Sequence, residues 1–333
     1  MPLLIVPEDQ AGQRLDLFLT GQGEDVSRSR VQKLIKAGGV KVGGVAETAP
    51  KFLLKAGDRI EFEDIEPPEP PPSIVSVTSP LEVHYDDNDL LVVYKPPGLA
   101  THPSAGHYEN SLVHWLMGRF ELAPDADGMR PGIVHRLDMD TSGLLVVAKN
   151  ARSLERLSEQ FKEHSVGRSY FALVWGLPTK KSGTVMKNIG VNPANRKKMG
   201  VVVEEEGRPA ITHWKVLEEL YPCALLDCTL ETGRTHQIRV HLSWAGSPLV
   251  GDITYGKGKR IYKNTSESIL NHLNGQQKQM LHAYRLSFNH PKTGHRMNFL
   301  RRPPNAYRET LEKLGSAIDF ESPAYLKSLH ISK

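Results

Sequence analysis

The feature that most constrains the fold is a proline-rich acidic segment near the N-terminal end. The stretch EDIEPPEPPPSIVSVTSP, residues 63–80, contains six prolines and four acidic residues but no basic residue. Proline fixes its own φ angle and has no amide donor, so such a stretch favours extended polyproline conformation over packed structure. We therefore expect two folded parts, residues 1–62 and residues 81 onward, joined by a semi-rigid linker at 63–80.

Length and composition are compatible with this division and predict a globular protein. The 333 residues suffice for one small and one large domain, and no run approaches the roughly 18 apolar residues of a membrane span. The first ten residues, MPLLIVPEDQ, lack the basic leader and long apolar stretch of a signal peptide. The two cysteines, Cys223 and Cys228, lie five apart on one predicted strand, which indicates reduced packing residues in a cytoplasmic protein.

Charge is unevenly distributed along the chain. Residues 1–62 carry nine basic and eight acidic residues, a net of +1, and residues 63–80 carry −4. Because the whole chain carries +4, the remainder must carry +7. This excess favours a polyanionic partner, although many proteins with a similar excess bind none.

The N-terminal part, residues 1–62, combines two short helices with a hairpin. We predict helices at 14–19 and 27–39 and a Gly-turned hairpin at 40–46. The inward-facing residues are Leu15, Phe18 and Leu19 in the first helix and Val31, Leu34 and Ile35 in the second. No acidic residue occurs between Ser27 and Lys41, and the second helix gathers cations on one face: Arg28, Arg30, Lys33 and Lys36. This face is either an RNA-binding surface or an ordinary solvated helix face.

In the part after the linker, the order of apolar patterns and turns predicts a mixed, mostly antiparallel α+β domain over residues 81–304. A C-terminal extension follows at 305–333. Its expected elements are strands at 90–94 and 169–176, a strand beginning at Cys223, and helices at 151–164 and about 235–244. The helices are too few and too irregularly spaced for a doubly wound parallel sheet.

One stretch of this part, GIVHRLDMDTSGLLVVAK at 132–149, has polar residues where a strand should stay apolar. Its flanks, Ile133-Val134 and Leu144 to Ala148, predict buried strand, while six polar side chains crowd between them: His135, Arg136, Asp138, Asp140, Thr141 and Ser142. Burying a carboxylate is costly unless it is paired or used in chemistry. A buried pair between Asp138 and an arginine, or a catalytic site, would account for it.

Several enzyme classes that this stretch resembles are disfavoured because the other motifs they need do not occur in the sequence. An aspartic protease needs a second DTSG-like loop, an aspartyl-phosphate enzyme needs an uninterrupted strand before the aspartate, and a kinase needs DFG and Gly-rich motifs; the chain has none of these. His236 and His241 lie five apart with no glutamate between them, which disfavours a metal site.

Four motifs occur together in order: KPPGLATHP from Lys95, PGIVHRLDMDTSGLLVVAK, RSYFALVWG, and ETGRTHQIRVHLSWAGSPLVGD. Together they resemble the RluA family of pseudouridine synthases over roughly residues 10 to 300. Residues 1–62 in turn resemble the S4-type RNA-binding module that ribosomal large-subunit members carry. The resemblance implies a pseudouridine synthase fold and isomerisation of uridine in RNA.

The resemblance also assigns roles to residues. It implies that Asp138 acts at the anomeric carbon, as nucleophile or as stabiliser of an oxocarbenium-like species, that Arg239 pairs with it, and that Tyr170 contacts the detached base. Arg136 matches a family arginine that contacts RNA around the flipped nucleotide. Asp140 does not match the family nucleophile. The reaction loses no atoms and transfers no electrons, so we expect neither metal nor redox cofactor.

The target is predicted less sharply than the chemistry. Large-subunit (23S) ribosomal RNA, or an assembly intermediate containing it, is the expected partner of a cytoplasmic monomer; tRNA or another RNA is the alternative. Where family members often have Pro-Ile-Gly-Arg, this chain has Asn188-Ile189-Gly190-Val191, with Arg196, Lys197 and Lys198 following. A non-catalytic RNA-binding factor and a hydrolase using Asp138 remain the competing functions.

Overall fold

The computed structural model describes residues 3–21, 28–62, 80–103, 110–125, 129–256, 258, 260–320 and 322, with only the backbone described at 28–30. The chain divides into two compact units: the smaller one contains Met1–Ser73 and the larger one nearly all of the remainder. Most of the predicted linker, residues 63–79, lies outside the described residues. Each unit has its own hydrophobic core.

The smaller unit packs two helices on a four-stranded antiparallel sheet. The helices are α1 (Leu15–Thr20) and α2 (Arg28–Lys36), and the sheet has the order β1-β4-β2-β3, formed by β1 (Leu3–Ile5), β4 (Arg59–Phe62), β2 (Val40–Val42) and β3 (Val45–Ala46). Leu15, Phe18 and Leu19 are buried in its core, as predicted. The predicted hairpin is confirmed, since β2 pairs with β3 across the turn at Gly43-Gly44.

The basic face of α2 is described only in part. Lys33 and Lys36 are exposed, while Val31 and Ile35 on the opposite side are fully buried. Arg28 and Arg30 belong to the helix, but their side chains lie outside the described residues. The spacing of apolar residues therefore predicted correctly which face of α2 is buried.

The larger unit is built on a nine-stranded mixed sheet, which confirms the α+β prediction. Its order is β5-β6-β7-β14-β8-β13-β12-β9, and β15 also pairs with β14. The strands are β5 (Glu82–Asp86), β6 (Leu90–Lys95), β7 (Ser142–Ala148), β8 (Gly167–Trp175), β9 (Ser182–Met186), β12 (Ile211–Leu220), β13 (Cys223–Leu230), β14 (Leu281–Asn289) and β15 (Arg296–Leu300). Among these pairs only β7 with β14 is parallel, and a small separate hairpin joins β10 (Ile189–Val191) to β11 (Met199–Val201).

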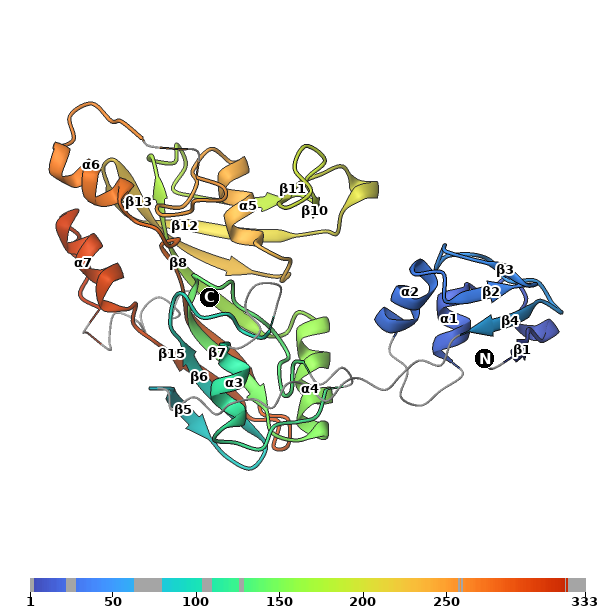
Figure 1. Cartoon of the computed structure of the whole chain (residues 1–333). Helices are drawn as coiled ribbons and strands as arrows, with labels where there is room; N and C mark the ends of the chain where they lie inside the picture. Colours follow the sequence, from blue (N-terminus) through green and yellow to red (C-terminus); the bar gives the residue numbers. More distant parts are fainter. Residues whose placement is uncertain are drawn as a thin grey trace. The chain divides into compact units, whose positions relative to one another are not determined.

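Helices cover both faces of this sheet, so its central strands are apolar on both sides (Figure 1). On one face, α3 (Leu112–Met117) and α5 (Gln237–Trp244) pack against a core that includes Leu91 and Val93. On the other, α4 (Ala151–Lys162), α6 (Glu267–Asn274) and α7 (Asn305–Lys313) pack against alternate residues of the same strands. The period-2 alternation of a strand places Tyr170 on the face of α3 and α5, and Phe171 on the opposite face.

Two close approaches of the backbone require glycine around the stretch 132–149. Gly132 has φ +70°, and a Cβ there would lie 2.4 Å from the carbonyl oxygen of Ala148. Gly143 has φ +134°, and its Cβ would lie 2.4 to 2.6 Å from atoms of Ala283. These contacts hold the segment tightly against β7 and β14.

One prediction about this stretch is wrong. Residues 133–134 do not form a strand and are only partly buried; Ile133 makes a single isolated bridge to Val147. The strand begins at Ser142, and residues 134–141 form a loop. Apolar side chains next to a strand can therefore belong to a loop that packs beside it, which a short apolar run cannot reveal.

The remaining sequence predictions of local structure hold closely. Helix α4 covers most of 151–164, β8 covers most of 169–176, and α5 begins two residues later than expected. Cys223 and Cys228 are both free and buried on β13, which confirms them as packing residues. Among the described residues, no helix has the length and apolar character needed to cross a membrane.

Candidate active site

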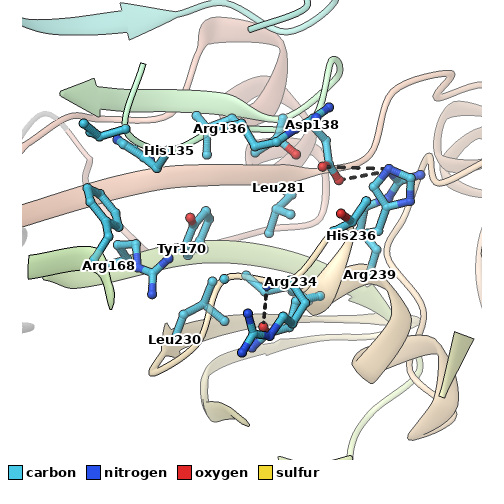
Figure 2. A pocket seen from close by; sticks show the side chains of 18 of the residues that line it. His135, Arg136, Asp138, Arg168, Tyr170, Leu230, Arg234, His236, Arg239 and Leu281 are labelled. Carbon is cyan, nitrogen blue, oxygen red and sulfur yellow. Dashed lines mark hydrogen bonds and ion pairs between the residues drawn. The ribbon is translucent and has the colours of Figure 1, made fainter. Parts of the chain in front are cut away.

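An open pocket of about 490 Å³ lies where β7, β14 and β8 adjoin at the centre of the larger sheet. Loop 134–141, strand β8, the start of β14 and the segment before α5 all contribute side chains to its wall (Figure 2). This size is within the range of small-molecule sites and so can accept a nucleoside-sized group. Four predicted site residues line it: Arg136, Asp138, Tyr170 and Arg239.

Asp138 is fixed at the pocket by the backbone on either side of it. Thr101 bonds both the carbonyl and the amide of Leu137, at 2.8 and 3.2 Å, and Gly98 donates its N–H to the carbonyl of Met139 at 2.9 Å. The motif KPPGLATHP thus braces the two neighbours of Asp138. The Asp138 side chain itself is 16% exposed and faces the pocket.

Lys95, at the start of this motif, is a fully buried cation that sequence reasoning did not single out. Its Nζ donates to the carbonyls of Pro96, Leu99 and Met139 at 2.8 to 3.0 Å. Burial lowers the pKa of Lys95 to about 7, although the nearby carboxylates of Asp138 and Asp140 oppose this shift. Three carbonyl acceptors match the three N–H donors of an ammonium, and the bond from Lys95 to Met139 adds to the one from Gly98.

Arg239, on α5, pairs with Asp138 through one donor only. Its Nη1 lies 3.0 Å from Oδ2 of Asp138, whereas Nε and Nη2 bind the two carboxylate oxygens of Asp252 at 2.7 and 3.0 Å. The predicted partnership with Asp138 is present, and it uses a single donor because the two-donor fork of the guanidinium binds Asp252. Although burial alone would lower it, ion pairing with Asp252 and Asp138 raises the pKa of Arg239, which stays charged.

Asp252 is a functional residue that the sequence analysis missed. It is fully buried, and its Oδ1 also accepts the backbone N–H groups of Thr254 and Tyr255 at 2.9 and 3.0 Å. The Tyr255 ring in turn packs against the Arg239 guanidinium at 5.0 Å. Asp252 lies at the end of a quoted motif, but nothing local distinguishes it from a surface acid.

The two histidines of the HQIRVH motif point to different places. His236 lines the pocket, and its Nε2 lies 3.9 Å from Oδ1 of Asp138. His241 is buried on α5, where Nδ1 contacts Thr212 and Nε2 contacts the carbonyl of Lys187. The two imidazole rings therefore do not converge on one point.

Tyr170 and Arg168 enter the pocket from β8, two residues apart and so on one face. Tyr170 is 6% exposed, and burial raises its pKa, so the phenol is protonated at neutral pH. Arg168 packs on the Phe161 ring at 5.5 Å, and Phe161 stacks on His135 at 4.6 Å. Burial lowers the pKa of His135 to about 3, which keeps this ring neutral where it accepts the N–H of Val146.

The rim of the pocket is cationic. Arg136 is exposed, and further basic side chains line the same opening: Arg130, Lys162 and Arg234. Asp138 is the carboxylate among the described pocket-lining residues. A basic rim around one carboxylate favours a polyanionic ligand. The part of that ligand that enters the pocket would face Asp138.

Comparison with known proteins agrees with this geometry. The family model described as RNA pseudouridylate synthase matches residues 89–244, and the S4 domain model matches residues 13–60. A Synechocystis RNA pseudouridine synthase is 42% identical over 294 residues, covering 87% of this chain and 85% of the relative. The chain belongs to the RNA pseudouridine synthase family.

Further relatives and solved structures of pseudouridine synthases extend the match. Ribosomal large subunit pseudouridine synthase D of Zymomonas mobilis is 40% identical, with 88% of this chain and 90% of the relative covered. The structure of human RNA pseudouridylate synthase domain containing 1 aligns with a TM-score of 0.53 at 27% identity, covering 75% of this chain and 98% of that one. The predicted family, the predicted fold and the S4-type module are thus confirmed.

Proposed function

We propose that this pseudouridine synthase isomerises uridines of large-subunit ribosomal RNA, with Asp138 as its catalytic carboxylate. Relatives about 40% identical over most of the chain bear the name ribosomal large subunit pseudouridine synthase D, which supports this target over tRNA. The observation that carries the catalytic assignment is a part-exposed carboxylate, held by one arginine donor, in a pocket with a basic rim. The protein acts as a cytoplasmic monomer without a cofactor.

Asp138 acts at the anomeric carbon of the target uridine. Breaking the N-glycosidic bond leaves positive charge on the sugar, which a carboxylate stabilises either electrostatically or by forming a bond. The uracil must then rotate and rejoin through carbon, so water that would capture the sugar has to be excluded. Leu137 and Leu281 give this part of the pocket an apolar wall.

Arg239 orients Asp138. Its charged guanidinium lies 3.0 Å from one oxygen of the carboxylate, and Asp252 fixes the guanidinium by accepting hydrogen bonds from Nε and Nη2. Arg239 is thereby held as a preorganised donor that needs no rearrangement when the substrate arrives.

Tyr170 contacts the detached uracil. Two roles are open to a phenol at this position, stacking on the base and accepting the proton that leaves carbon. A raised pKa favours the first role, because a protonated phenol can stack and donate a hydrogen bond but cannot accept that proton at neutral pH.

Arg136 holds the RNA from which the uridine is taken. A base paired or stacked inside folded RNA cannot reach Asp138, so it must be flipped out, and a planar cation can occupy the vacated space. Arg136 is two residues from Asp138 and exposed at the rim, which suits that task.

The S4-type unit adds a second RNA contact through the basic face of α2, with Lys33 and Lys36 exposed and Arg28 and Arg30 on the same helix. Replacing Lys33 and Lys36 by Gln in the full chain should flatten the log–log salt dependence of RNA binding by roughly 1.5 units. The same change at exposed Lys51 and Lys55 is the matched control. Equal slopes for both variants would remove the RNA-binding role of α2.

The proposed function is tested by incubating the protein with unmodified large-subunit RNA and mapping pseudouridine by chemical mass tagging. Small-subunit RNA and tRNA are the parallel substrates. We expect pseudouridine at defined positions of the large-subunit RNA. Modification of tRNA alone would overturn the target, release of free uracil would indicate a hydrolase, and binding without either product would indicate an RNA-binding factor.

A further inference from the structure

The segment that leads into α5 places His236 beside Asp138 in an unusual backbone conformation. His236 has φ +57°, in the left-handed region, directly before the first residue of the helix. Non-glycine residues occupy this region only at an energetic cost, because Cβ approaches the backbone. The cost indicates that the position of this ring matters, and the ring lies against Asp138, with Nε2 3.9 Å from Oδ1.

Tyr255 contacts the nitrogen of His236 that faces away from Asp138. The Tyr255 hydroxyl oxygen accepts the backbone N–H of Met199 at 3.1 Å and lies 2.8 Å from Nδ1 of His236. Among the described residues, Nδ1 of His236 is the acceptor within reach of the hydroxyl proton. A neutral His236 that accepts this proton at Nδ1 carries its own proton on Nε2.

His236 is neutral in this setting. Burial lowers its pKa and Arg239 acts in the same direction, while Asp138 and Asp252 oppose the shift. The charged groups around the ring are the carboxylates of Asp138 and Asp252 and the guanidinium groups of Arg239 and Arg136. The Nε2–H bond is thus directed at the carboxylate oxygen that Arg239 leaves free.

We propose that His236 is a positioning residue for Asp138, held by Tyr255 in the Nε2–H tautomer so that it can donate to Oδ1. The proposal rests on the proposed function and adds a residue to it. The Cβ–Cγ torsion of an aspartate is broad, so the single contact from Arg239 to Oδ2 does not fix the carboxylate plane. A donor at Oδ1 fixes it, and the 3.9 Å gap closes as bound RNA excludes water.

In this arrangement Tyr255 affects Asp138 only through His236. A glutamine at position 236 offers an amide N–H near the place of Nε2–H and needs no tautomer selection, whereas an alanine offers no donor. Tyr255 should consequently matter only when a histidine occupies position 236. A double-mutant cycle measures this dependence directly.

The experiment compares single-turnover pseudouridine formation and RNA affinity for wild type, His236→Ala, His236→Gln, Tyr255→Phe and the double variant His236→Gln/Tyr255→Phe. We expect His236→Ala to slow the reaction about 10- to 100-fold with RNA affinity within about threefold of wild type. His236→Gln should recover most of the rate. Tyr255→Phe should lower the single-turnover rate when position 236 is histidine. It should lower the rate hardly at all when position 236 is glutamine.

The matched control is His213→Gln, which changes an exposed histidine paired with Glu231 and should leave the rate unchanged. Three results would overturn the proposal: a wild-type rate for His236→Ala, a parallel loss of rate and RNA affinity, or an equal cost of Tyr255→Phe in both backgrounds. If His236→Ala does not fold, the two Tyr255→Phe comparisons still decide it.

A second measurement separates this proposal from the proposed function. Nitrogen-15 NMR reports the tautomer of each histidine, and the His236 signals are those missing in His236→Gln. We expect an unprotonated Nδ1 and a protonated Nε2 in the free wild-type protein, with mixed tautomers in Tyr255→Phe. An Nδ1–H tautomer or an imidazolium at neutral pH would refute the proposal even if no RNA were modified.

Discussion

Loop 134–141 and the loop that follows α5 each bring a carboxylate to Arg239, but in different surroundings. Asp252 is fully buried, receives two donors from the guanidinium and accepts two backbone N–H groups. Asp138 receives one donor and stays 16% exposed at the pocket. A carboxylate with every acceptor used can only hold structure, whereas one with free acceptors can act on a substrate.

The two acids should therefore differ in how much their replacement changes the reaction rate and the stability of the fold. Removing the charge at Asp138 should affect chemistry far more than folding, and removing it at Asp252 should affect both. Single substitutions at these positions and their neighbours test this difference through the reaction rate and the free energy of unfolding.

Asp138→Asn should abolish isomerisation, with a rate loss of at least about 10⁴-fold, because an amide keeps the shape but cannot stabilise positive charge at the anomeric carbon. RNA affinity and the thermal unfolding midpoint should stay near wild type. Single-turnover assays with mass-tagged RNA and a thermal melt check both. Turnover within tenfold of wild type would remove Asp138 from the chemistry.

Arg239→Lys should slow the reaction by about 10³-fold although the charge is kept, because lysine cannot bind Asp252 with a fork and Asp138 with a third donor at once. We expect a lower unfolding midpoint as well, since Asp252 loses a buried partner. A lysine variant with nearly normal turnover would show that the fork on Asp252 does not matter for catalysis.

Asp252→Asn should slow the reaction by about 10²-fold and lower the free energy of unfolding by about 3 kcal/mol, since a buried pair loses one charge and Arg239 loses its alignment. Chemical denaturation and single-turnover rates measure the two effects. If only the rate fell, as for Asp138→Asn, Asp252 would not have the structural role that distinguishes it from Asp138.

Asp140→Asn should change the rate less than about threefold. The side chain is only partly buried, and its carboxylate accepts no hydrogen bond from other described residues. It provides the matched control for Asp138, two residues away on the same loop. A loss comparable to that of Asp138→Asn would mean that the loop as a whole, rather than one carboxylate, is required.

The sequence was most informative where a property depends on neighbouring residues. Periodicity placed Val31 and Ile35 of α2 inward, and the Gly-Gly turn placed the hairpin at 40–46, because helix and strand periods and turn angles are local. The co-occurrence of four motifs brought Asp138, Tyr170 and Arg239 to one site through family resemblance. Residues 133–134 were misjudged because a short apolar run does not distinguish a strand from a packed loop.

By itself the sequence determined the family, the secondary structure of the helices and strands it predicted apart from residues 133–134, and four of the residues that line the pocket. Only the tertiary structure decided how the donors of Arg239 are divided, because Asp138 lies 101 residues away and Asp252 lies 13 away across a helix and a turn. It likewise placed the His236 ring between Tyr255, from the later loop, and Asp138. Hydrogen-bond partners across such distances are fixed by the packing of the sheet and its helices, which no local pattern encodes.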